Sequence, residues 1–168
     1  MPSRWLSAGA TAVSLGLVLA LTGSGPVLAK VDPIAALTAD LDGVPIKLEQ
    51  VGQWYCDDFS YPAIHCFSSP VVLEARSAVF QLVSSVDFVT VYELGSFSGS
   101  YMHMSQDYTA LLTIGWNDRI SSLKGRNNVA SRFFGDWFYG GAPYDVCCNV
   151  QITALGSFDN TFSSVRRT

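Results

Sequence analysis

The chain has 168 residues, of which 49% are hydrophobic and 14% are charged, and its formal net charge is −4. This composition is too apolar for a disordered chain, and a mild acid excess without a basic stripe argues against a nucleic-acid partner. Aromatic residues make up 12% of the chain. Together with many Gly, Ser and Thr residues, they favour short strands joined by tight turns.

Residues 1–29 have the pattern of a secretory signal peptide. Arg4 supplies the basic start, an apolar stretch runs from Ala10 to Leu21, and Val27-Leu28-Ala29 fits the small-x-small cleavage pattern. The alternative is a membrane anchor, but the apolar stretch is shorter than the roughly 20 residues that a spanning helix needs. We therefore expect a secreted, extracellular protein that begins at Lys30 and has no membrane span after cleavage.

Residues 30–86 form an N-terminal segment with mixed patterning. A short helix is predicted over Ile34–Leu41. After Pro70, the apolar spacing up to Val83 predicts a second short helix, with Ser69 as its N-cap.

Four cysteines follow the leader, and export would place them where disulfides persist. Four cysteines allow three connectivities. A Cys147–Cys148 bond is the least attractive, because adjacent residues on a strand point to opposite faces. A Cys56–Cys66 bond needs only a hairpin, and bonds between the two regions are equally allowed. No Cys/His spacing fits a zinc site.

From residue 87 onward the sequence is doubled. Tyr92 to Gly99 has the form aromatic, four residues, Phe, one residue, Gly, and Phe133 to Gly140 repeats that form. Asn117 to Ser122 has the form Asn/Asp, Asn/Asp, x, x, Ser, Ser, and Asp159 to Ser164 matches it at the first, second, fifth and sixth positions. The offset between the aromatic motifs is one residue shorter than the offset between the hexapeptides. Two patterns that recur in the same order at nearly the same period indicate an internal duplication.

Each unit of about 40 residues has room for four short strands, the content of one Greek key. The predicted fold class is therefore all-β, with two keys packed as a β-sandwich over residues 87–168. The first key spans about 87–127 and the second about 128–168. Gly99 and Gly140 are expected at positive φ, where each hairpin folds over sharply.

These paired motifs resemble those of the βγ-crystallin superfamily, in its microbial, calcium-binding branch. The resemblance covers about half of the chain, and it implies two calcium sites built between the loops of the two keys. It implies side-chain oxygens from Asp118 and Asn160, loop-holding roles for Asn117 and Asp159, hydroxyls from Ser121 and Ser163, and backbone carbonyls from Glu93, Arg119, Phe134 and Thr161.

The chemistry of the two hexapeptides agrees with that implication. Calcium takes six to eight oxygen ligands, many of them backbone or neutral. Each hexapeptide has one carboxylate, Asp118 or Asp159, so we expect a modest affinity of about 10⁻⁵ to 10⁻³ M. Asn160 stands where a stronger site would have Asp. The alternative is that the loops close the sandwich through hydrogen bonds and bind no metal.

Signals of enzymatic activity are weak. His65 and His103 share no metal-binding spacing, and His103 lies in a strand-like stretch that favours a structural role. The adjacent carboxylates Asp57 and Asp58 are interpreted as a solvated turn, because neighbouring side chains diverge. We therefore predict that the protein is not an enzyme.

A weaker echo of the aromatic motif lies at Trp54–Tyr61, and Phe80–Ser85 keeps the two serines of the hexapeptide without its acids. The region is either a decayed third copy or a separate capping segment, and no metal site is assigned there.

The favoured hypothesis is a secreted, non-enzymatic βγ-crystallin-like protein that binds calcium and has a structural or stabilising role. One alternative is a secreted metalloprotease inhibitor, since exported inhibitors of this fold share the small size and the four cysteines. Another is an antimicrobial or killer-toxin-like protein. The expected partners are calcium ions and, under the alternatives, an extracellular protease or a cell-surface partner.

Overall fold

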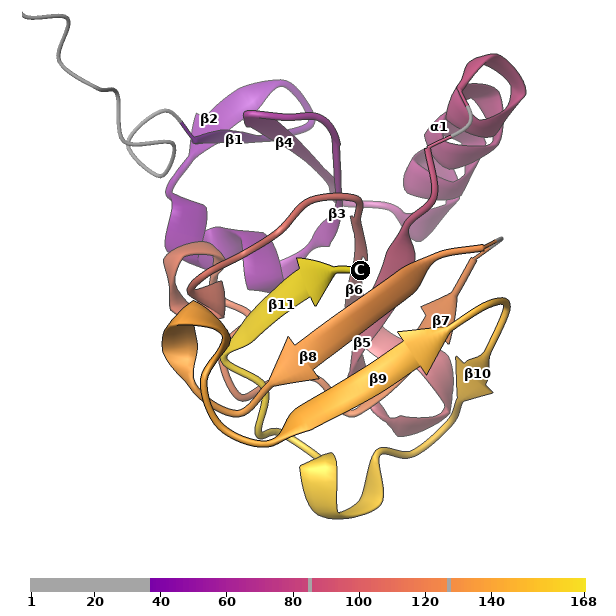
Figure 1. Ribbon diagram of the computed structural model, residues 1–168. Helices are drawn as coiled ribbons and strands as arrows, with labels where there is room; N and C mark the ends of the chain where they lie inside the picture. The colour runs from indigo at the N-terminus through magenta and orange to yellow at the C-terminus, as the bar shows by residue number, and fades with distance from the viewer. Residues whose placement is uncertain (1–36, 85, 127) are drawn as a thin grey trace, which may run out of the picture. The chain divides into compact units, whose positions relative to one another are not determined.

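The computed structural model describes residues 37–84, 86–126 and 128–168, which belong to one compact unit (Figure 1). The predicted signal peptide and its cleavage site lie outside the described residues. Within the described part of the chain, no helix is long and apolar enough to cross a membrane.

Most of the ordered structure is strand. Helix α1 spans Pro70–Val83, and short 3₁₀ turns occur at η2 (Leu48–Gln53), η3 (Gly95–Phe97), η4 (Leu111–Ile114), η5 (Trp137–Tyr139) and η6 (Gly156–Phe158). The strands are β1 (Thr38–Leu41), β2 (Val44–Ile46), β3 (Tyr55–Ser60), β4 (Ala63–Phe67), β5 (Val89–Leu94), β6 (Ser98–Met104), β7 (Ser122–Gly125), β8 (Ala130–Phe134), β9 (Pro143–Cys147), β10 (Gln151–Ile152) and β11 (Ser164–Arg167).

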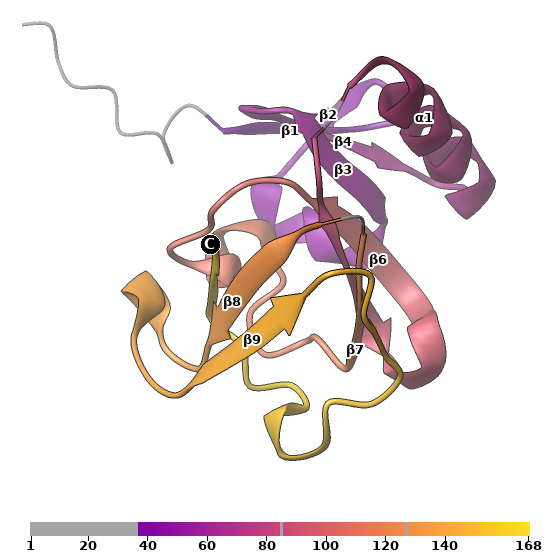
Figure 2. The ribbon, with the colours of Figure 1, turned by 45° about the vertical axis from the view of Figure 1, so that its right-hand side comes forward.

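Two sheets are formed, and the two keys are interlocked between them. One sheet has the order β10-β7-β5-β6-β3-β4-β1-β2 and the other has the order β11-β8-β9. β10 comes from the second key but pairs with β7 of the first, and Tyr108 of the first key bridges Val165 in β11. In Figures 1 and 2, β8 and β9 lie in a separate layer from β5, β6 and β7. The predicted all-β fold with two Greek keys is confirmed.

The alternation of β5 explains why it forms a central strand. Val89 and Val91 lie in the sandwich core with residues of both sheets. Tyr92 points to the other face, where it belongs to a second buried cluster with Tyr101 and Leu73 of α1, and Thr90 is also fully buried. Residues on both faces of β5 are therefore buried, as is typical of a central strand.

Helix α1 confirms the second helix prediction, with Pro70 at its first turn. The backbone of Ser69 is extended, as at an N-cap, but its side chain makes no capping hydrogen bond. The helix packs inward through Leu73 and Ser77, and its outer face carries exposed valines and leucine. Because Phe80 lies within α1, this region does not form a third copy of the loop motif.

The N-terminal segment continues the larger sheet. β3 runs parallel to β6 with Tyr55 opposite Tyr101, and β4 pairs with both β3 and β1. The predicted helix over Ile34–Leu41 is wrong where it is described, since Thr38–Leu41 forms β1. Asp42 and Gly43 take positive φ values of 51° and 83° and close the β1–β2 hairpin. An Asp-Gly pair between short runs favours such a turn, and this local signal outweighs the weak helical pattern.

Two disulfides are present. Cys56–Cys66 joins directly opposed residues of β3 and β4 and is fully buried. Cys147–Cys148 joins adjacent residues, the connectivity that the sequence makes least attractive. The strand argument does not apply there, because β9 ends at Cys147 and Cys148 has a left-handed φ of 59°.

In the structure, the aromatic motifs and the hexapeptides recur at the same offset. Tyr92 contacts Phe97 with ring centroids 5.5 Å apart, and Phe134 contacts Tyr139 at 5.7 Å. Gly99 has the expected positive φ of 78°.

The second glycine prediction is wrong by one residue. Gly140 has a φ of −89°, whereas Gly141 has a φ of 77°. The aromatic motif of the second key therefore begins at Phe134 rather than Phe133, which gives it the same spacing from the first key as the hexapeptides have.

Candidate metal centre between the paired loops

The two hexapeptides lie side by side and bind each other through reciprocal backbone hydrogen bonds. The Asp118 N–H donates to the Phe162 carbonyl at 3.0 Å, and the Asn160 N–H donates to the Ile120 carbonyl at 3.0 Å. Asp118 and Asn160 have matching left-handed φ values of 54° and 53°. Asp and Asn tolerate this conformation better than most residues, which explains their place at the second position of each loop.

Side-chain oxygens from opposite loops meet in two equivalent clusters. The Ser163 hydroxyl donates to Asp118 Oδ1 at 3.4 Å, and the Ser121 hydroxyl donates to Asn160 Oδ1 at 3.3 Å. The structure thus pairs the second position of each hexapeptide with the fifth position of the other. We call the pair Asp118 and Ser163 the first cluster, and the pair Asn160 and Ser121 the second cluster.

The first cluster opens into a surface depression lined by Asn117, Asp118, Gly135, Asp136, Trp137 and Ser163. Asn117 orients the carboxylate, since its Nδ2 donates to Asp118 Oδ2 at 2.7 Å. The Trp137 indole N–H donates to Asn117 Oδ1 at 3.0 Å and holds Asn117 in turn. The loop-holding role that the resemblance implies for Asn117 stays a prediction.

The structure places Gly135, and not Phe134, at the position equivalent to Glu93. The Phe134 carbonyl accepts the Ser163 N–H at 2.8 Å, as the Tyr92 carbonyl accepts the Ser121 N–H at 3.0 Å. Gly135 and Asp136 line the depression but are not marked as site residues by the sequence motifs. The offset of the hexapeptides, applied to the aromatic motif, would have identified Gly135.

The second cluster is flanked by an ion pair that the sequence does not indicate. The Arg119 guanidinium donates to Glu93 Oε1 at 2.6 Å and to the Gly115 carbonyl at 3.0 Å. The hydrogen bond from Arg119 lowers the pKa of the Glu93 carboxyl, and a bond from Ser100 acts in the same direction. The Glu93 carboxylate is bound by Arg119, so the group of Glu93 that could face a cation is its backbone carbonyl.

The side chains of Thr161 and Asp159 contact near neighbours in the sequence. The Thr161 hydroxyl donates to the Phe158 carbonyl at 2.9 Å, and the Asn160 amide donates to Asp159 Oδ2 at 3.4 Å. The loop-holding role of Asp159 stays a prediction. Thr161 and Arg119 retain their carbonyls as candidate ligands.

The donor set suits a hard cation that accepts neutral oxygens. In the described part of the chain, no three His, Cys, Asp or Glu side chains gather as a metal site. Apart from Asp118 and Asp136 in the depression of the first cluster, a cation there would rely on hydroxyl, amide and carbonyl oxygens. Calcium accepts such a set, whereas zinc prefers nitrogen and sulfur ligands.

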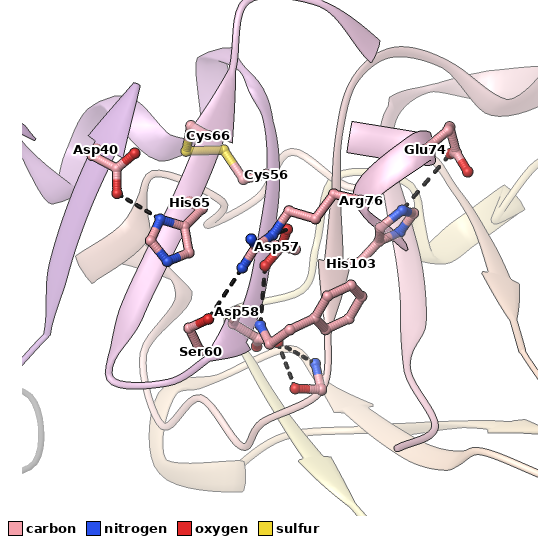
Figure 3. A network of polar contacts seen from close by, with 12 residues as sticks. Asp40, Cys56, Asp57, Asp58, Ser60, His65, Cys66, Glu74, Arg76 and His103 are labelled. Carbon is pink, nitrogen blue, oxygen red and sulfur yellow. Dashed lines mark hydrogen bonds and ion pairs between the residues drawn. A yellow bond between two sulfur atoms is a disulfide. The ribbon is translucent and has the colours of Figure 1, made fainter. Parts of the chain in front are cut away.

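A separate polar network ties the N-terminal segment to the first key (Figure 3). Asp57 and Asp58 are both fully buried on β3, so the interpretation of a solvated turn is wrong. Asp57 accepts a hydrogen bond from Arg76 Nε at 2.7 Å. Asp58 Oδ1 accepts the Ser105 N–H and hydroxyl, each at 2.7 Å, and Asp58 Oδ2 accepts the Tyr108 hydroxyl at 2.9 Å.

The two carboxylates have different partners because adjacent strand residues point to opposite faces. Burial raises the pKa of Asp57 and raises the pKa of Asp58 to about 6. Their side chains hold packed elements together, and the divergence expected from the sequence is confirmed.

The two histidines also lie in different surroundings. His65 Nδ1 is 2.7 Å from Asp40 Oδ2 on the neighbouring strand. His103 is fully buried, and its Nδ1 is 2.9 Å from the Thr90 hydroxyl. Burial lowers the pKa of His103 to about 3, so it is neutral at physiological pH. These contacts support the structural role predicted for His103.

No family model and no curated protein matches this chain. The solved structures that match include βγ-crystallin domains, the superfamily that the sequence motifs resemble.

A βγ-crystallin from an archaeon is 29% identical, with a TM-score of 0.45, over 50% of this chain and 100% of its own. A βγ-crystallin domain from Flavobacterium johnsoniae is 27% identical, with a TM-score of 0.43, over 48% of this chain and 92% of its own. The βγ-crystallin from Ciona intestinalis is 23% identical, with a TM-score of 0.44, over 48% and 99%. The interlocked keys are evident from the strand order of this chain, independently of these similarities.

Proposed function

We propose that the protein is a secreted, non-enzymatic calcium-binding protein in which two ions fasten the loops 117–122 and 159–164 to each other. The observation that carries the proposal is the reciprocal pairing of Asp118 with Ser163 and of Asn160 with Ser121. Two pairs of oxygens related by the same offset are what a duplicated cation site requires.

The first cluster supplies one carboxylate from Asp118, the Ser163 hydroxyl and the carbonyl of Gly135. The second cluster supplies the Asn160 amide oxygen, the Ser121 hydroxyl and the carbonyl of Glu93. The carbonyls of Arg119 and Thr161 would complete the two sets. The second cluster has the neutral amide of Asn160 where the first cluster has the carboxylate of Asp118. The second cluster should therefore bind calcium more weakly.

Calcium would act by stabilising the folded protein. A cation between the loops neutralises Asp118 and joins segments that are far apart in the sequence, so it binds the folded state in preference to the unfolded chain. Binding at a free concentration ten times the dissociation constant stabilises the fold by about 1.4 kcal/mol per site.

Export is supported by the leader pattern and by the two disulfides. Extracellular compartments keep such bonds oxidised, and their calcium concentration matches sites of modest affinity. The buried Cys56–Cys66 bond and the proposed calcium sites would both stabilise the fold outside the cell.

The test is calorimetric titration of residues 30–168 with calcium, together with thermal unfolding in calcium and in chelator. We expect binding at micromolar to millimolar calcium and a higher melting temperature in calcium. Asp118→Asn should abolish the stronger site or weaken it about tenfold or more, and Asn160→Asp should strengthen the weaker one.

Asp145→Asn is the matched control, because Asp145 is an exposed carboxylate of β9 that pairs with Arg132. It changes the net charge equally but should leave the titration unchanged. Absence of both heat and a melting shift at millimolar calcium would reject the proposal.

A further inference from the structure

The second key changes sheets over a very short connection. The chain leaves β9 at Cys147 and enters β10 at Gln151, where it pairs with β7 in the other sheet. Figure 1 shows this turn from β9 into β10. The Cys147–Cys148 bond lies at the start of the connection, and both cysteines are exposed.

In the first key the chain also passes from one sheet to the other, but different contacts hold that connection in place. β6 ends at Met104, and four residues later Tyr108 reaches the other sheet and bridges Val165. Ser105 occupies the place that Cys147 has in the second key, since Met104 pairs with Val89 as Val146 pairs with Ser131. The buried Asp58 accepts both hydrogen bonds of Ser105. The first crossing is therefore fixed by a buried carboxylate, whereas the second has a covalent bond at the surface.

Two backbone hydrogen bonds also hold the second crossing. The Cys148 N–H donates to the Val129 carbonyl, and the Gly125 N–H donates to the Val150 carbonyl, each at 2.9 Å. Cys148 and Asn149 both have a φ of 59°, a left-handed conformation that is strained for most residues. Because β10 has only two residues, its pairing with β7 gives the connection little further support.

We propose that Cys147–Cys148 is a site of reversible thiol–disulfide exchange that reacts with dithiols, and that opening it loosens the crossing from β9 to β10. A thiolate must reach a sulfur of the disulfide in order to attack it. Cys147 and Cys148 are open to solvent, whereas Cys56 and Cys66 are fully buried in the core. The two bonds should therefore react at very different rates in the folded protein.

The dithiol supplies all the electrons and protons that the exchange needs. A thiolate of the dithiol attacks one sulfur, the bond between Cys147 and Cys148 breaks, and a mixed disulfide forms. The second thiol of the reagent then displaces the protein sulfur and closes a cyclic disulfide. Two electrons and two protons pass to the protein, which leaves two cysteine thiols. Because these thiols are adjacent, an oxidant can join them again within the same molecule.

The experiment treats the oxidised protein briefly with dithiothreitol under native conditions, blocks free thiols with iodoacetamide, and maps the label by mass spectrometry. We expect Cys147 and Cys148 to be labelled at least tenfold faster than Cys56 and Cys66. Hydrogen exchange on the same samples should show faster exchange at the Gly125 and Cys148 amides, with the Ser105 amide unchanged. Oxidised glutathione should restore protection after the dithiol is removed.

The double variant Cys147→Ser/Cys148→Ser is the control. It should show the fast exchange at the Gly125 amide without reductant, and dithiothreitol should not change it further. If the variant fails to fold, the reduced wild-type protein still carries the test. Three results would overturn the proposal: both thiols labelled without reductant, equal rates for the two disulfides, or complete reduction of Cys147–Cys148 with no change in amide exchange. None of these readouts depends on calcium.

Discussion

At the scale of single residues, Asp58 shows how a buried carboxylate links pH to stability. It is fully buried and accepts three hydrogen bonds, but desolvation dominates and raises its pKa from 3.8 to about 6. The folded state therefore holds the proton more tightly than the unfolded chain. The stabilising contribution is fully present below about pH 4 and is lost as the pH rises through 6.

Replacing Asp58 with Asn should remove this dependence. Asn has nearly the same shape and stays neutral, so the free energy of unfolding of the variant relative to wild type should rise between pH 4 and pH 7, by up to about 3 kcal/mol. The measurement is urea unfolding at pH 4, 5, 6 and 7, followed by tryptophan fluorescence. The comparison with wild type cancels other titrating groups such as His103, whose depressed pKa acts in the opposite direction.

Asp145→Asn serves again as the exposed control and should give a difference that varies much less with pH. Parallel curves for Asp58→Asn and wild type would show that Asp58 has no raised pKa in the folded protein.

The residues of the candidate metal centre could be found from sequence to the extent that the motif repeats. The hexapeptides locate Asp118, Asn160 and both serines, because loop chemistry is local and depends on short oxygen-bearing side chains. The ion pair between Glu93 and Arg119 could not be predicted, since the two residues are 26 positions apart and meet only through the folded hairpin. The burial of Asp58 likewise depends on Ser105 and Tyr108, far along the chain.

At the scale of elements, the folded hairpins between β5 and β6 and between β8 and β9 test the register of the duplication. Gly141 has a φ of 77°, and a Cβ built on it would lie 2.9 Å from Asp136 Oδ2. Gly140 has a φ of −89°, which any residue can adopt, and a Cβ there would be 3.3 Å from its nearest neighbours.

Gly141→Ala should therefore destabilise the protein by about 1 to 2 kcal/mol, because alanine is strained in the left-handed region. Gly140→Ala should cost clearly less, since its φ is unstrained and small shifts of Asp136 and of the Trp137 carbonyl make room for the methyl group. Thermal and urea unfolding of the two variants measure the difference. A larger loss for Gly140→Ala would restore the register that begins at Phe133.

Elements with a clear local pattern are predicted well from the sequence, and elements that depend on pairing are not. α1 has apolar spacing typical of a helix and an explicit start at Pro70, so local preference and tertiary packing agree. The sequence pattern favours a helix over β1 because the four residues of that strand carry little pattern of their own. Its structure comes from pairing with β4 and from the Asp42-Gly43 turn, and pairing partners cannot be read from a short segment.

At the scale of the whole molecule, the N-terminal segment is built into the sheet of the first key. β3 pairs with β6, and Val51, Cys56 and Ile64 belong to the same buried cluster as the sandwich residues. Gly52 and Gly115 lie so close that a Cβ on Gly52 would overlap the Gly115 carbonyl oxygen. This close approach packs η2 of the N-terminal segment against the end of η4 in the first key.

A fragment of residues 87–168 should therefore fold poorly by comparison with residues 30–168. Without the N-terminal segment, β6 becomes an exposed edge, Ser105 and Tyr108 lose Asp58, and the apolar face under α1 meets water. We expect the fragment to show broad amide resonances and no cooperative melting, whereas the longer chain melts in a single transition. Gly52→Val in the longer chain should weaken the same interface and lower its melting temperature. A fragment that melts cooperatively at the temperature of the longer chain would show that the doubled domain is independent of the segment that precedes it.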